Sequence, residues 1–336
     1  MSTNNVNIVI PAITVVNELI FCLKKLNNLN FKNFQVTIVL DFDNKKKISF
    51  TNYKVNKIIV GKKNMSEKRN LGVKKIKSEY VAFIDSDTYT PKDWLKNCLY
   101  TLKEDRADIV GGPDIPFENQ NYFELISHYC KKSFFITGHL NYRKSMSPKR
   151  ICKDWLASCN ILMRRKFYLN NNGMNEKNYF QEDQEFFDRI RKKNKNLKVI
   201  FSPKCFLYHK ERTLSKFFLQ RLAFGTALIE ATSFTKGIKG LIPIIPLFTF
   251  LATCLVMISI ENLNDKLFFL LSLIVLVNIG IFIETIKNVR TFFSILLVIL
   301  SINFASVLHI LGSVIGLLNL KNLFQRRIYI LSRNND

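Results

Sequence analysis

Two aspartates separated by one serine follow a short apolar run in the sequence. The stretch YVAFIDSDTYTPKDWL places Asp85 and Asp87 directly after that run. Carboxylates at positions i and i+2 point to the same side of an extended chain, where their like charges repel. The spacing therefore predicts that a cation lies between them. An alternative is that one aspartate, Asp87 in particular, caps a helix that begins near Pro91.

Short β-branched runs alternate with segments of helical period before these aspartates and just after them. Residues 19–26 place apolar side chains on one helical face, Ser66 suits a helix N-cap, and Pro91 suits the first position of another helix. Strands alternating with helices indicate a mostly parallel α/β sheet. The predicted strands are residues 7–11, 35–40, 57–60, 80–85 and 108–112.

Three of these predicted strands end in residues that could serve a ligand. Pro11, Asp41 and Asp85 lie at or just after a strand end. In open α/β sheets, ligands bind beyond the carboxyl ends of the strands, so we expect all three residues at one crevice. The sequence contains neither G-x-x-x-x-G-K-[ST] nor G-x-G-x-x-G. A P-loop and a dinucleotide fingerprint are therefore excluded.

Composition limits the function classes. The formal net charge of +24 fits a basic surface that faces nucleotide phosphates or anionic lipid head groups, although a coding bias toward lysine is an alternative source. No helix-turn-helix, RNP or zinc-finger pattern is present, so we expect no nucleic-acid partner.

Seven scattered cysteines without a C-x-x-C pair argue against a zinc site and a disulfide framework. They fit a reducing compartment, and the N-terminus MSTNNVNIVIP lacks a cleavable signal, which predicts a start in the cytoplasm.

Three apolar runs follow Gly240, at residues 241–260, 267–286 and 291–320. Each approaches or exceeds the roughly 20 residues that span a bilayer as a helix. With the charged N-terminal part inside, the connector ENLNDK lies outside and KNVR inside, in agreement with the positive-inside rule. Three spans would place the basic tail outside, which disagrees with that rule. Either one run is re-entrant or interfacial, with the proline-containing first run the suspect, or the rule fails at the tail.

The segment before these runs has an amphipathic pattern. Phe217, Phe218 and Leu222 cluster, while Lys216 and Arg221 remain polar. The pattern favours a helix at the membrane surface, or an ordinary amphipathic helix packed on the soluble domain. The predicted organisation is a catalytic domain (1–213), an interfacial region (214–236), a transmembrane region of two to three helices (237–320) and a basic tail (321–336).

Six sequence blocks now carry a family resemblance, over about residues 6–225. In chain order they are NIVIPAITVVNELIFCLKKL, VTIVLDFDN, MSEKRNLGVKKIKSEYVAFIDSDTYTPKDWL, DWLASCNILMRRKFY, NYFQEDQEFFDRIRKK and VIFSPKCFLYHKERT. They resemble family 2 glycosyltransferases of the GT-A fold. The resemblance implies an α/β, Rossmann-like mixed-sheet domain followed by C-terminal transmembrane helices. It also implies a nucleotide-diphospho-sugar donor, with a UDP-sugar favoured.

The same resemblance assigns residues to the donor and to a metal. Asp85 and Asp87 match the D-x-D motif, and His209 matches a histidine that completes a Mg²⁺ or Mn²⁺ site in relatives; an ordinary surface or core histidine is the alternative. The D-D-G-S block is degraded to DFDN, which leaves Asp41 or Asp43 as the base-recognising residue. Arg69 matches an arginine near the nucleotide, with a solvated helix-face arginine as the alternative. The implied donor-binding set is Pro11, Glu18, Asp41, Arg69 and Asp85.

The acceptor side is assigned in the same way. Asp183, in QEDQEFF, matches the catalytic aspartate, which would take the proton of the attacking hydroxyl group. Acidic residues at a helix N-terminus are also favoured by the helix dipole alone. Trp155, Asn160 and Glu182 fall where relatives shape the acceptor pocket, with a core position as the alternative for Trp155.

Two departures from the family pattern refine the prediction. Processive relatives carry Q-x-x-R-W where this chain has QRLAFG, which favours transfer of a single sugar. The start PAITVVNE lacks the aromatic residue of P-x-Y-N-E, which leaves the base preference open.

The predicted protein is a metal-dependent, inverting hexosyltransferase of the cytoplasmic (inner) membrane, with its catalytic domain facing the cytoplasm. Its acceptor is lipid-linked or membrane-proximal, in surface glycan biosynthesis. Alternatives are a processive polysaccharide synthase and a non-catalytic membrane scaffold.

Overall fold

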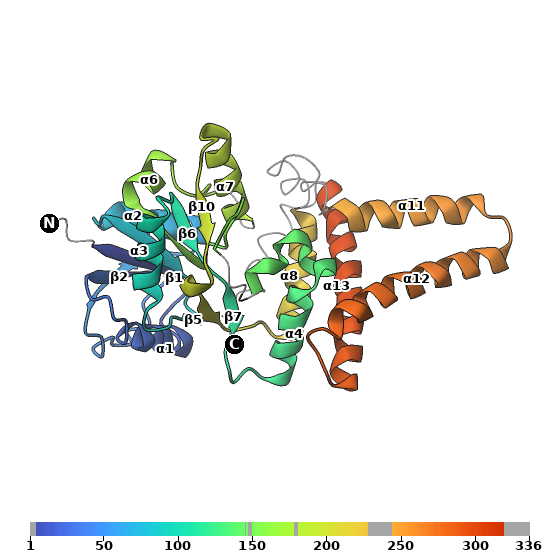
Figure 1. Cartoon of the computed structure of the whole chain (residues 1–336), viewed down its shortest axis with the longest axis horizontal. Helices are drawn as coiled ribbons and strands as arrows, with labels where there is room; N and C mark the ends of the chain where they lie inside the picture. The colour runs from blue at the N-terminus through green and yellow to red at the C-terminus, as the bar shows by residue number, and fades with distance from the viewer. Residues whose placement is uncertain (1–4, 145, 147–149, 178–180, 228–243, 319–336) are drawn as a thin grey trace. The chain divides into compact units, whose positions relative to one another are not determined.

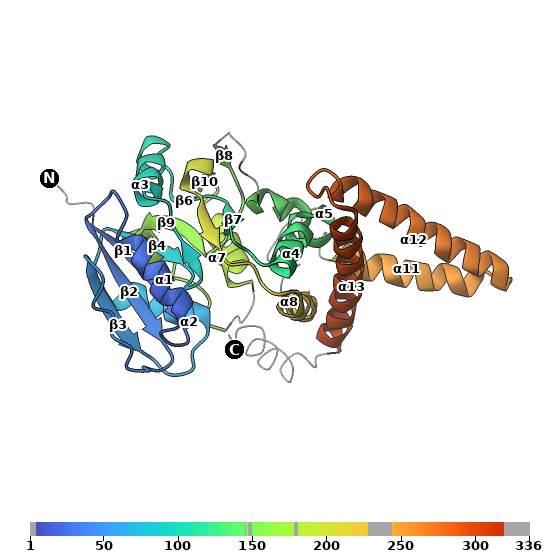
Figure 2. The ribbon, with the colours of Figure 1, turned by 90° about the horizontal axis from the view of Figure 1, so that it is seen from below.

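The computed structural model describes residues 5–144, 146, 150–177, 181–227 and 244–318. The chain divides into two compact units (Figures 1 and 2). Unit 1 comprises residues 1–118 and 142–210, and unit 2 comprises residues 119–141 and 211–336. The second break lies close to the predicted boundary at residue 213. The grouping of residues 119–141 with the C-terminal part was not predicted.

Unit 1 is built on an eight-stranded mixed sheet with the order β3-β2-β1-β4-β9-β6-β10-β8. The first four strands are mutually parallel, whereas β9 runs antiparallel between β4 and β6. The five predicted strands are confirmed, and the sheet is mixed, as the family resemblance implied. The strands are β1 (Val6–Ala12), β2 (Phe34–Leu40), β3 (Lys54–Ile59), β4 (Tyr80–Ile84), β6 (Ile109–Gly111), β8 (Ile151–Cys152), β9 (Asn160–Arg164) and β10 (Val199–Phe201).

Helices cover both faces of this sheet. The apolar face of α1, predicted within residues 19–26, is buried in one core with side chains of α3, β1, β2 and β4. On the opposite face Gly72 of α2 approaches β1, where a Cβ atom would come within 2.5 Å of Val9 Cγ1. The helices of unit 1 are α1 (Asn17–Leu26), α2 (Met65–Lys75), α3 (Trp94–Glu104), α6 (Arg165–Asn170) and α7 (Glu182–Lys193).

Two predicted helix starts are wrong. Asn64, not Ser66, is the N-cap of α2, because its side chain and that of Glu67 form a reciprocal capping box. Helix α3 begins at Trp94, three residues after Pro91, and residues 92–93 form a turn. Both errors concern the first turn, where several polar residues compete for the same cap.

A second, three-stranded sheet in unit 1 has the order β5-β11-β7. Its strands are β5 (Thr88–Tyr89), β7 (Asp114–Pro116) and β11 (Leu207–His209). Strand β11 pairs antiparallel with β5, with His209 opposite Thr88, and the rings of Tyr89 and Tyr208 stack with centroids 4.3 Å apart. This register brings His209 beside the segment that contains Asp85 and Asp87.

Unit 2 is helical. The close packing of α8 on α13 depends on glycines: a Cβ atom at Gly225 would come within 2.2 Å of the His309 carbonyl oxygen, and one at Gly312 within 2.2 Å of the Leu222 carbonyl oxygen. The amphipathic segment predicted within 214–236 thus forms a helix that packs on α13; its part after residue 227 lies outside the described residues. The helices are α4 (Tyr122–Lys132), α5 (Phe134–Thr137), α8 (Leu214–Thr226), α11 (Ile245–Ser259), α12 (Leu263–Thr285) and α13 (Phe292–Leu317).

Two of these helices, α12 and α13, are long and apolar enough to cross a membrane, with mean hydropathies of 2.5 and 2.3. The described part of the first predicted run, α11, has 15 residues and is shorter than a usual span. Among the described residues, two of the three apolar runs therefore form helices of spanning length. The number of helices that cross a membrane stays a prediction.

Candidate active site

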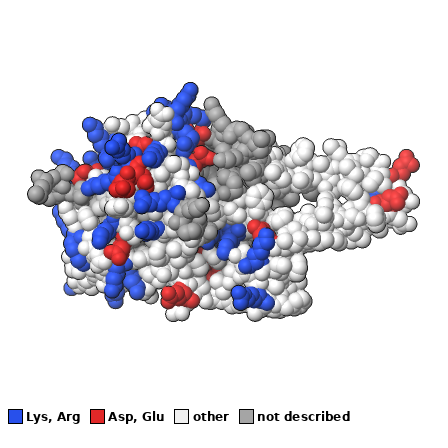
Figure 3. All heavy atoms as spheres, in the orientation of Figure 1, with Lys and Arg blue, Asp and Glu red and all other residues white. Residues whose placement is uncertain are grey.

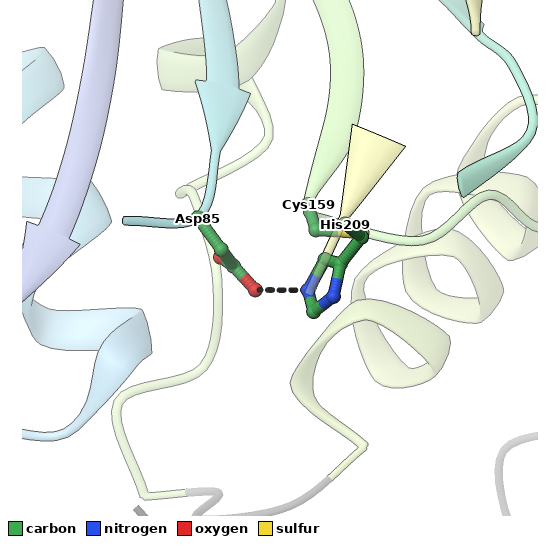
Figure 4. Close-up of side chains that lie close together, drawn as sticks. All are labelled: Asp85, Cys159 and His209. Carbon is green, nitrogen blue, oxygen red and sulfur yellow. Dashed lines mark ion pairs between the residues drawn. The ribbon is translucent and has the colours of Figure 1, made fainter. Parts of the chain in front are cut away.

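The three residues predicted to bind a metal lie close together in unit 1. Asp85 follows β4, Asp87 precedes β5, and His209 ends β11. The Nε2 atom of His209 lies 3.8 Å from Asp85 Oδ2 and 3.6 Å from Asp87 Oδ1. Figure 4 shows the Asp85 carboxylate and the His209 ring pointing toward each other. Two carboxylates and one imidazole thus meet where the two sheets of the unit approach.

The chemistry of this group fits a divalent cation. The Nδ1 atom of His209 lies 2.7 Å from the carbonyl oxygen of Lys210, so a proton on Nδ1 leaves the Nε2 lone pair facing the carboxylates. Burial by itself would lower the pKa of His209, but Asp87 and Asp85 raise it overall. The negative field that causes this rise would equally attract a metal ion. Carboxylate oxygens with one imidazole suit Mn²⁺ and Mg²⁺.

A cysteine that the sequence did not indicate lies in the same group. Asp85, Cys159 and His209 offer ligand atoms that all lie within 4.8 Å of one another (Figure 4). Burial, with Asp114 and Asp85 nearby, holds the pKa of Cys159 well above its ordinary value. The thiol therefore stays neutral and lacks the charge of a thiolate ligand. Its position within DWLASCN was the available sequence signal, but a lone cysteine without a spacing pattern carries little information.

Arg69 joins the two sides of the site. It lies on α2 with 1% of its surface exposed, which rules out a solvated helix-face arginine. Its Nη2 atom lies 2.9 Å from Asp85 Oδ1 and its Nη1 atom 2.9 Å from Glu182 Oε1. Burial would lower the pKa of Arg69, but these two carboxylates raise it overall, so the guanidinium stays charged. Arg69 therefore links the Asp85 side to the start of α7.

Asp183 lies at the start of α7, next to Glu182 but in a different environment. Gln181 precedes them in the left-handed region, with φ of 59°. The Asp183 carboxylate accepts hydrogen bonds from the backbone N–H groups of Ser158 (3.3 Å) and Gln184 (2.9 Å). Burial and the charge of Glu182 raise the pKa of Asp183 to about 6. A carboxylate that titrates near neutral pH is suited to accept a proton.

The structure separates the two candidates for base recognition. Asp41 follows β2, and its Oδ1 atom lies 2.8 Å from Lys68 Nζ and accepts a hydrogen bond from the Lys63 backbone N–H. Lys68 Nζ also donates to the carbonyl oxygen of Ala12 at the end of β1. Asp43, by contrast, is exposed and pairs with Lys57 at the surface. Asp41 therefore lies at the shared carboxyl edge of the strands.

Two further predicted donor residues lie on neighbouring elements. Pro11 is buried within β1, one residue before the strand ends. Glu18, in the first turn of α1, lies 3.1 Å from Lys210 Nζ, next to His209 in the sequence. Both residues border the edge of the sheet that carries Asp41 and Asp85.

The predicted acceptor residues behave differently. Asn160 is 1% exposed, accepts a hydrogen bond from Trp94 Nε1 at 2.9 Å, and donates to the carbonyl oxygens of Gly112 and Cys205. This geometry gives Asn160 a structural role, and its contact with the acceptor stays a prediction. Trp155 is buried and lies under the Arg143 guanidinium, 4.9 Å from the ring centroid. The Glu182 carboxylate is bound to Arg69.

This chain resembles known glycosyltransferases in sequence. The family model described as "Glycosyl transferase family 2" matches residues 7–211. Glycosyltransferase GlyA of Streptococcus pneumoniae serotype 4 (strain ATCC BAA-334 / TIGR4) is 26% identical over 139 residues, which cover 38% of this chain and 20% of GlyA. The matched segment thus spans about a fifth of that relative's length.

Among solved structures, mannosyltransferase PcManGT from Pyrobaculum calidifontis, in complex with GDP-Man and Mn²⁺, superposes with a TM-score of 0.56 at 11% identity, over 94% of this chain and 87% of that chain. TarS 1–349 of S. aureus gives a TM-score of 0.46 at 16% identity, over 95% and 91%. The PcManGT likeness supports the GT-A fold. Because the family model matches the greater part of the sequence, this chain belongs to glycosyl transferase family 2.

Proposed function

We propose that this protein transfers one sugar from a nucleotide diphosphate sugar to an acceptor hydroxyl group, with inversion at the anomeric carbon and dependence on a divalent metal ion. The observation that carries the proposal is the pair of 2.9 Å contacts of Arg69. They hold the metal-binding carboxylate Asp85 and the start of α7, with Asp183, in one site. Such a transfer needs a cation at the leaving diphosphate and a base at the attacking hydroxyl group.

The metal side consists of Asp85, Asp87 and His209. A bound Mg²⁺ or Mn²⁺ would neutralise the negative charge that develops on the diphosphate as it leaves. Arg69 orients the Asp85 carboxylate, and the Nδ1 contact of His209 to the Lys210 carbonyl oxygen fixes the direction of the His209 ring. Asp41, held by Lys68, can accept a hydrogen bond from a pyrimidine N–H group, which favours a UDP-sugar.

The base side consists of Asp183. Its carboxylate takes the proton from the acceptor hydroxyl group as the oxygen attacks the anomeric carbon opposite the leaving group, and this geometry inverts the configuration. Backbone N–H groups of Ser158 and Gln184 orient the carboxylate without supplying a positive charge. The raised pKa strengthens Asp183 as a base while leaving most of it ionised at pH 7.

The acceptor is proposed to be lipid-linked or membrane-proximal, in surface glycan biosynthesis at the cytoplasmic membrane. The two helices of spanning length in unit 2 support this proposal, because an anchored enzyme can meet a substrate that is itself confined to the membrane. The segment QRLAFG in α8 lacks the Q-x-x-R-W pattern of processive relatives. Its absence supports a single transfer. The catalytic unit is proposed to face the cytoplasm.

The test is donor consumption by the detergent-solubilised protein with UDP-, GDP- and dTDP-sugars, Mg²⁺ or Mn²⁺, and membrane lipid extract as acceptor. We expect one donor to be consumed and the product to be longer by one sugar. The NMR signal of the anomeric proton should show that the new bond has the anomeric configuration opposite to that of the donor. The Asp183→Asn chain should spare the donor but keep the rise in thermal midpoint caused by donor and Mn²⁺. A ladder of products would identify a processive synthase, and no thermal shift with any donor would identify a scaffold.

A further inference from the structure

The apolar helices of unit 2 are covered by protein to very different extents. Helix α11 buries Leu247 alone, and α12 buries two residues, Ile281 and Thr285, near its C-terminal end. Helix α13 instead buries a continuous face, formed by Ser294, Val298, Ser301, Ile302, Ala305, His309, Gly312, Ser313 and Gly316. The pair α11 and α12 is therefore apolar and uncovered on nearly all sides, whereas α13 is covered on one.

The opposite face of α13 is exposed and apolar. Its residues recur every three or four positions, and we name them the α13 stripe: Leu296, Leu300, Phe304, Val307 and Leu311. A helix that crosses lipid by itself exposes apolar side chains all round, as α12 does. A helix that exposes one apolar stripe suits a position along the membrane interface.

Helices α4 and α8 cover the buried face of α13. The close approach of α8 occurs at Gly225 and Gly312, as described above. Helix α4 contacts the start of α13 through a hydrogen bond between the hydroxyl groups of Tyr122 and Ser294 (2.9 Å), and Cys130 Sγ lies 3.9 Å from the Val298 carbonyl oxygen. These contacts attach α13 to a protein layer on the side that faces away from its stripe.

The directions of the helices agree with this division. In both views α4 and α8 lie on one side of α13, the pair α11 and α12 projects from the other side, and α13 runs crosswise to that pair (Figures 1 and 2). Membrane-spanning helices tilt by about 20° on average and by about 40° at most. Helices that run crosswise to each other cannot both cross one bilayer, and α11 and α12 are the uncovered pair.

The lengths of α11 and α12 also fit the thickness of a bilayer. The Asn278 side chain accepts a hydrogen bond from Asn303 of α13 (2.8 Å), so the part of α12 that precedes this contact has about 15 residues and a length of about 22 Å. Helix α11 has 15 residues and a similar length, about 22 Å. An interfacial helix lies about 5–10 Å below the head-group boundary. Added to the projecting part, this depth gives about 30 Å, which is the thickness of the hydrocarbon layer.

Charge at the connectors supplies an independent argument. The tip of the hairpin, formed by the link between α11 and α12 and the first turn of α12, contains Glu261, Asp265 and Lys266. The connector before α13 contains Lys287 and Arg290, and residues 319–336 contain four further Lys and Arg residues. Figure 3 shows α11 and α12 almost free of charge, with acidic side chains at the tip. If α13 does not cross, the basic connector and the basic tail both stay on the side of the catalytic unit. The conflict with the positive-inside rule then disappears.

We propose that α11 and α12 form a hairpin that crosses the bilayer twice, and that α13 lies in the interface on the side of the catalytic unit, with the α13 stripe toward lipid. The proposal rests on the membrane location given under the proposed function. It assigns the interfacial role to the third apolar run, whereas the prolines of the first run had made that run the suspect.

The test is the labelling of one accessible cysteine at a time by a membrane-impermeant maleimide in sealed vesicles of both orientations. The partly exposed Cys254 of α11 is replaced by serine throughout, and the other native cysteines apart from Cys152 are buried. Native Cys152 is exposed in unit 1 and reports the side of the catalytic unit. In a Cys152→Ser background, Asn264→Cys reports the tip, Asn288→Cys the connector before α13, and Asn335→Cys the tail. We expect the connector and the tail to be labelled from the Cys152 side, and the tip from the other.

The other outcomes overturn the proposal in distinguishable ways. Three spans would place the tail with the tip, and spans formed by α12 and α13 would place the connector alone on the far side. Labelling of every position from one side would mean that nothing crosses. Flotation with vesicles is measured in parallel: a chain that floats but gives another pattern overturns this topology alone, whereas a chain that does not float overturns the membrane location as well.

A second measurement reports depth. Native Trp94 and Trp155 are buried in unit 1, so an added tryptophan at a lipid-facing position dominates quenching by spin-labelled lipids. Leu271 of α12 is 59% exposed and Phe304 at the middle of α13 is 51% exposed, which makes Leu271→Trp and Phe304→Trp a matched pair. We expect deep labels to quench Leu271→Trp most and shallow labels to quench Phe304→Trp most. Equal quenching of both by the deep label would show that α13 spans and would overturn the proposal.

Discussion

The two sides of the candidate active site hold their carboxylates in different ways. On the β4 side, Asp85 lies against the Arg69 guanidinium, and Asp41 lies against Lys68. On the α7 side, Asp183 accepts backbone N–H groups and has no ion-pair partner among the described residues, and burial beside Glu182 raises its pKa to about 6. Positive partners suit a carboxylate that must remain charged, whereas a raised pKa suits one that must accept a proton.

The largest expected effect comes from Asp183→Asn. Because an amide cannot accept the proton, we expect the transfer rate to fall by about 10²–10⁴-fold. Donor binding should persist, and at pH 7 the thermal midpoint should not fall, because the neutral side chain removes a buried charge that forms no ion pair among the described residues. Steady-state transfer and thermal unfolding with donor and Mn²⁺ measure both quantities. The control on the same helix is Asp188→Asn, which removes the surface pair with Lys192; similar rates for the two variants would contradict the assignment.

Asp85→Asn tests the β4 side of the candidate active site. Loss of the carboxylate removes a proposed metal ligand and one partner of Arg69, so we expect transfer to fall by about 10²-fold or more, equivalent to several kcal/mol at the transition state. The rise in thermal midpoint caused by Mn²⁺ with donor should disappear. Asp43→Asn, which changes an exposed aspartate paired with Lys57, should leave both readouts unchanged. A normal metal-dependent shift in Asp85→Asn would place the metal elsewhere.

Asn160→Ala should affect stability more than catalysis. The variant leaves Trp94 Nε1 and the carbonyl oxygens of Gly112 and Cys205 without their buried partner. We expect the free energy of unfolding to fall by about 1–3 kcal/mol, with an unchanged KM for the acceptor. Denaturant unfolding and acceptor titration separate the two effects. Asn97→Ala is the matched control, because its exposed amide donates to one carbonyl oxygen. A raised KM for the acceptor at normal stability would instead support the predicted contact of Asn160 with the acceptor.

The smallest effects concern pH. Since the base must be unprotonated, kcat/KM should rise with pH through about 6 and then level off. The charge of Glu182 contributes to the raised pKa, so Glu182→Gln should move this inflection to lower pH. An inflection that moves upward, or not at all, would show that another group controls the profile.

Stability should follow the same titration with a defined sign. The folded-state pKa of Asp183 lies above its ordinary value of 3.8, so its contribution to stability is full below 3.8 and is lost as the pH rises through about 6. Relative to the wild type, Asp183→Asn should therefore become more stable across this range. Denaturant unfolding at several pH values measures the difference, and a difference independent of pH would contradict the assigned pKa.

The parts of the fold that depend on contiguous patterns were predictable from the sequence. Strands β1, β2 and β4 are mostly apolar and almost entirely buried. Their ends, together with the motifs at Asp85 and Asp183, indicated where the site residues would lie. Cap choice was less predictable, because Asn64 and Ser66 both suit an N-cap and the capping box with Glu67 decides between them.

Features that depend on pairing across long separations were not predictable. The contact between Arg69 and Glu182 joins residues 113 positions apart. His209 reaches the aspartates through strands of two and three residues, which are too short to show a period. The membership of residues 119–141 in unit 2 likewise follows from tertiary packing, for which one sequence contains no direct signal. For Cys159 the only signal was its position within DWLASCN, which a lone cysteine leaves weak.

The insertion of residues 119–141 has a consequence for how the chain folds as it is synthesised. Cys130 contacts Val298, which leaves the ribosome 168 residues later. At about 5–20 residues per second, α4 waits roughly 10–30 seconds for its partner, and residues 142–210, which complete unit 1, are synthesised in that interval. During that interval the apolar side chains that α4 later buries, Ile126 and Cys130, need a chaperone or the membrane itself to shield them.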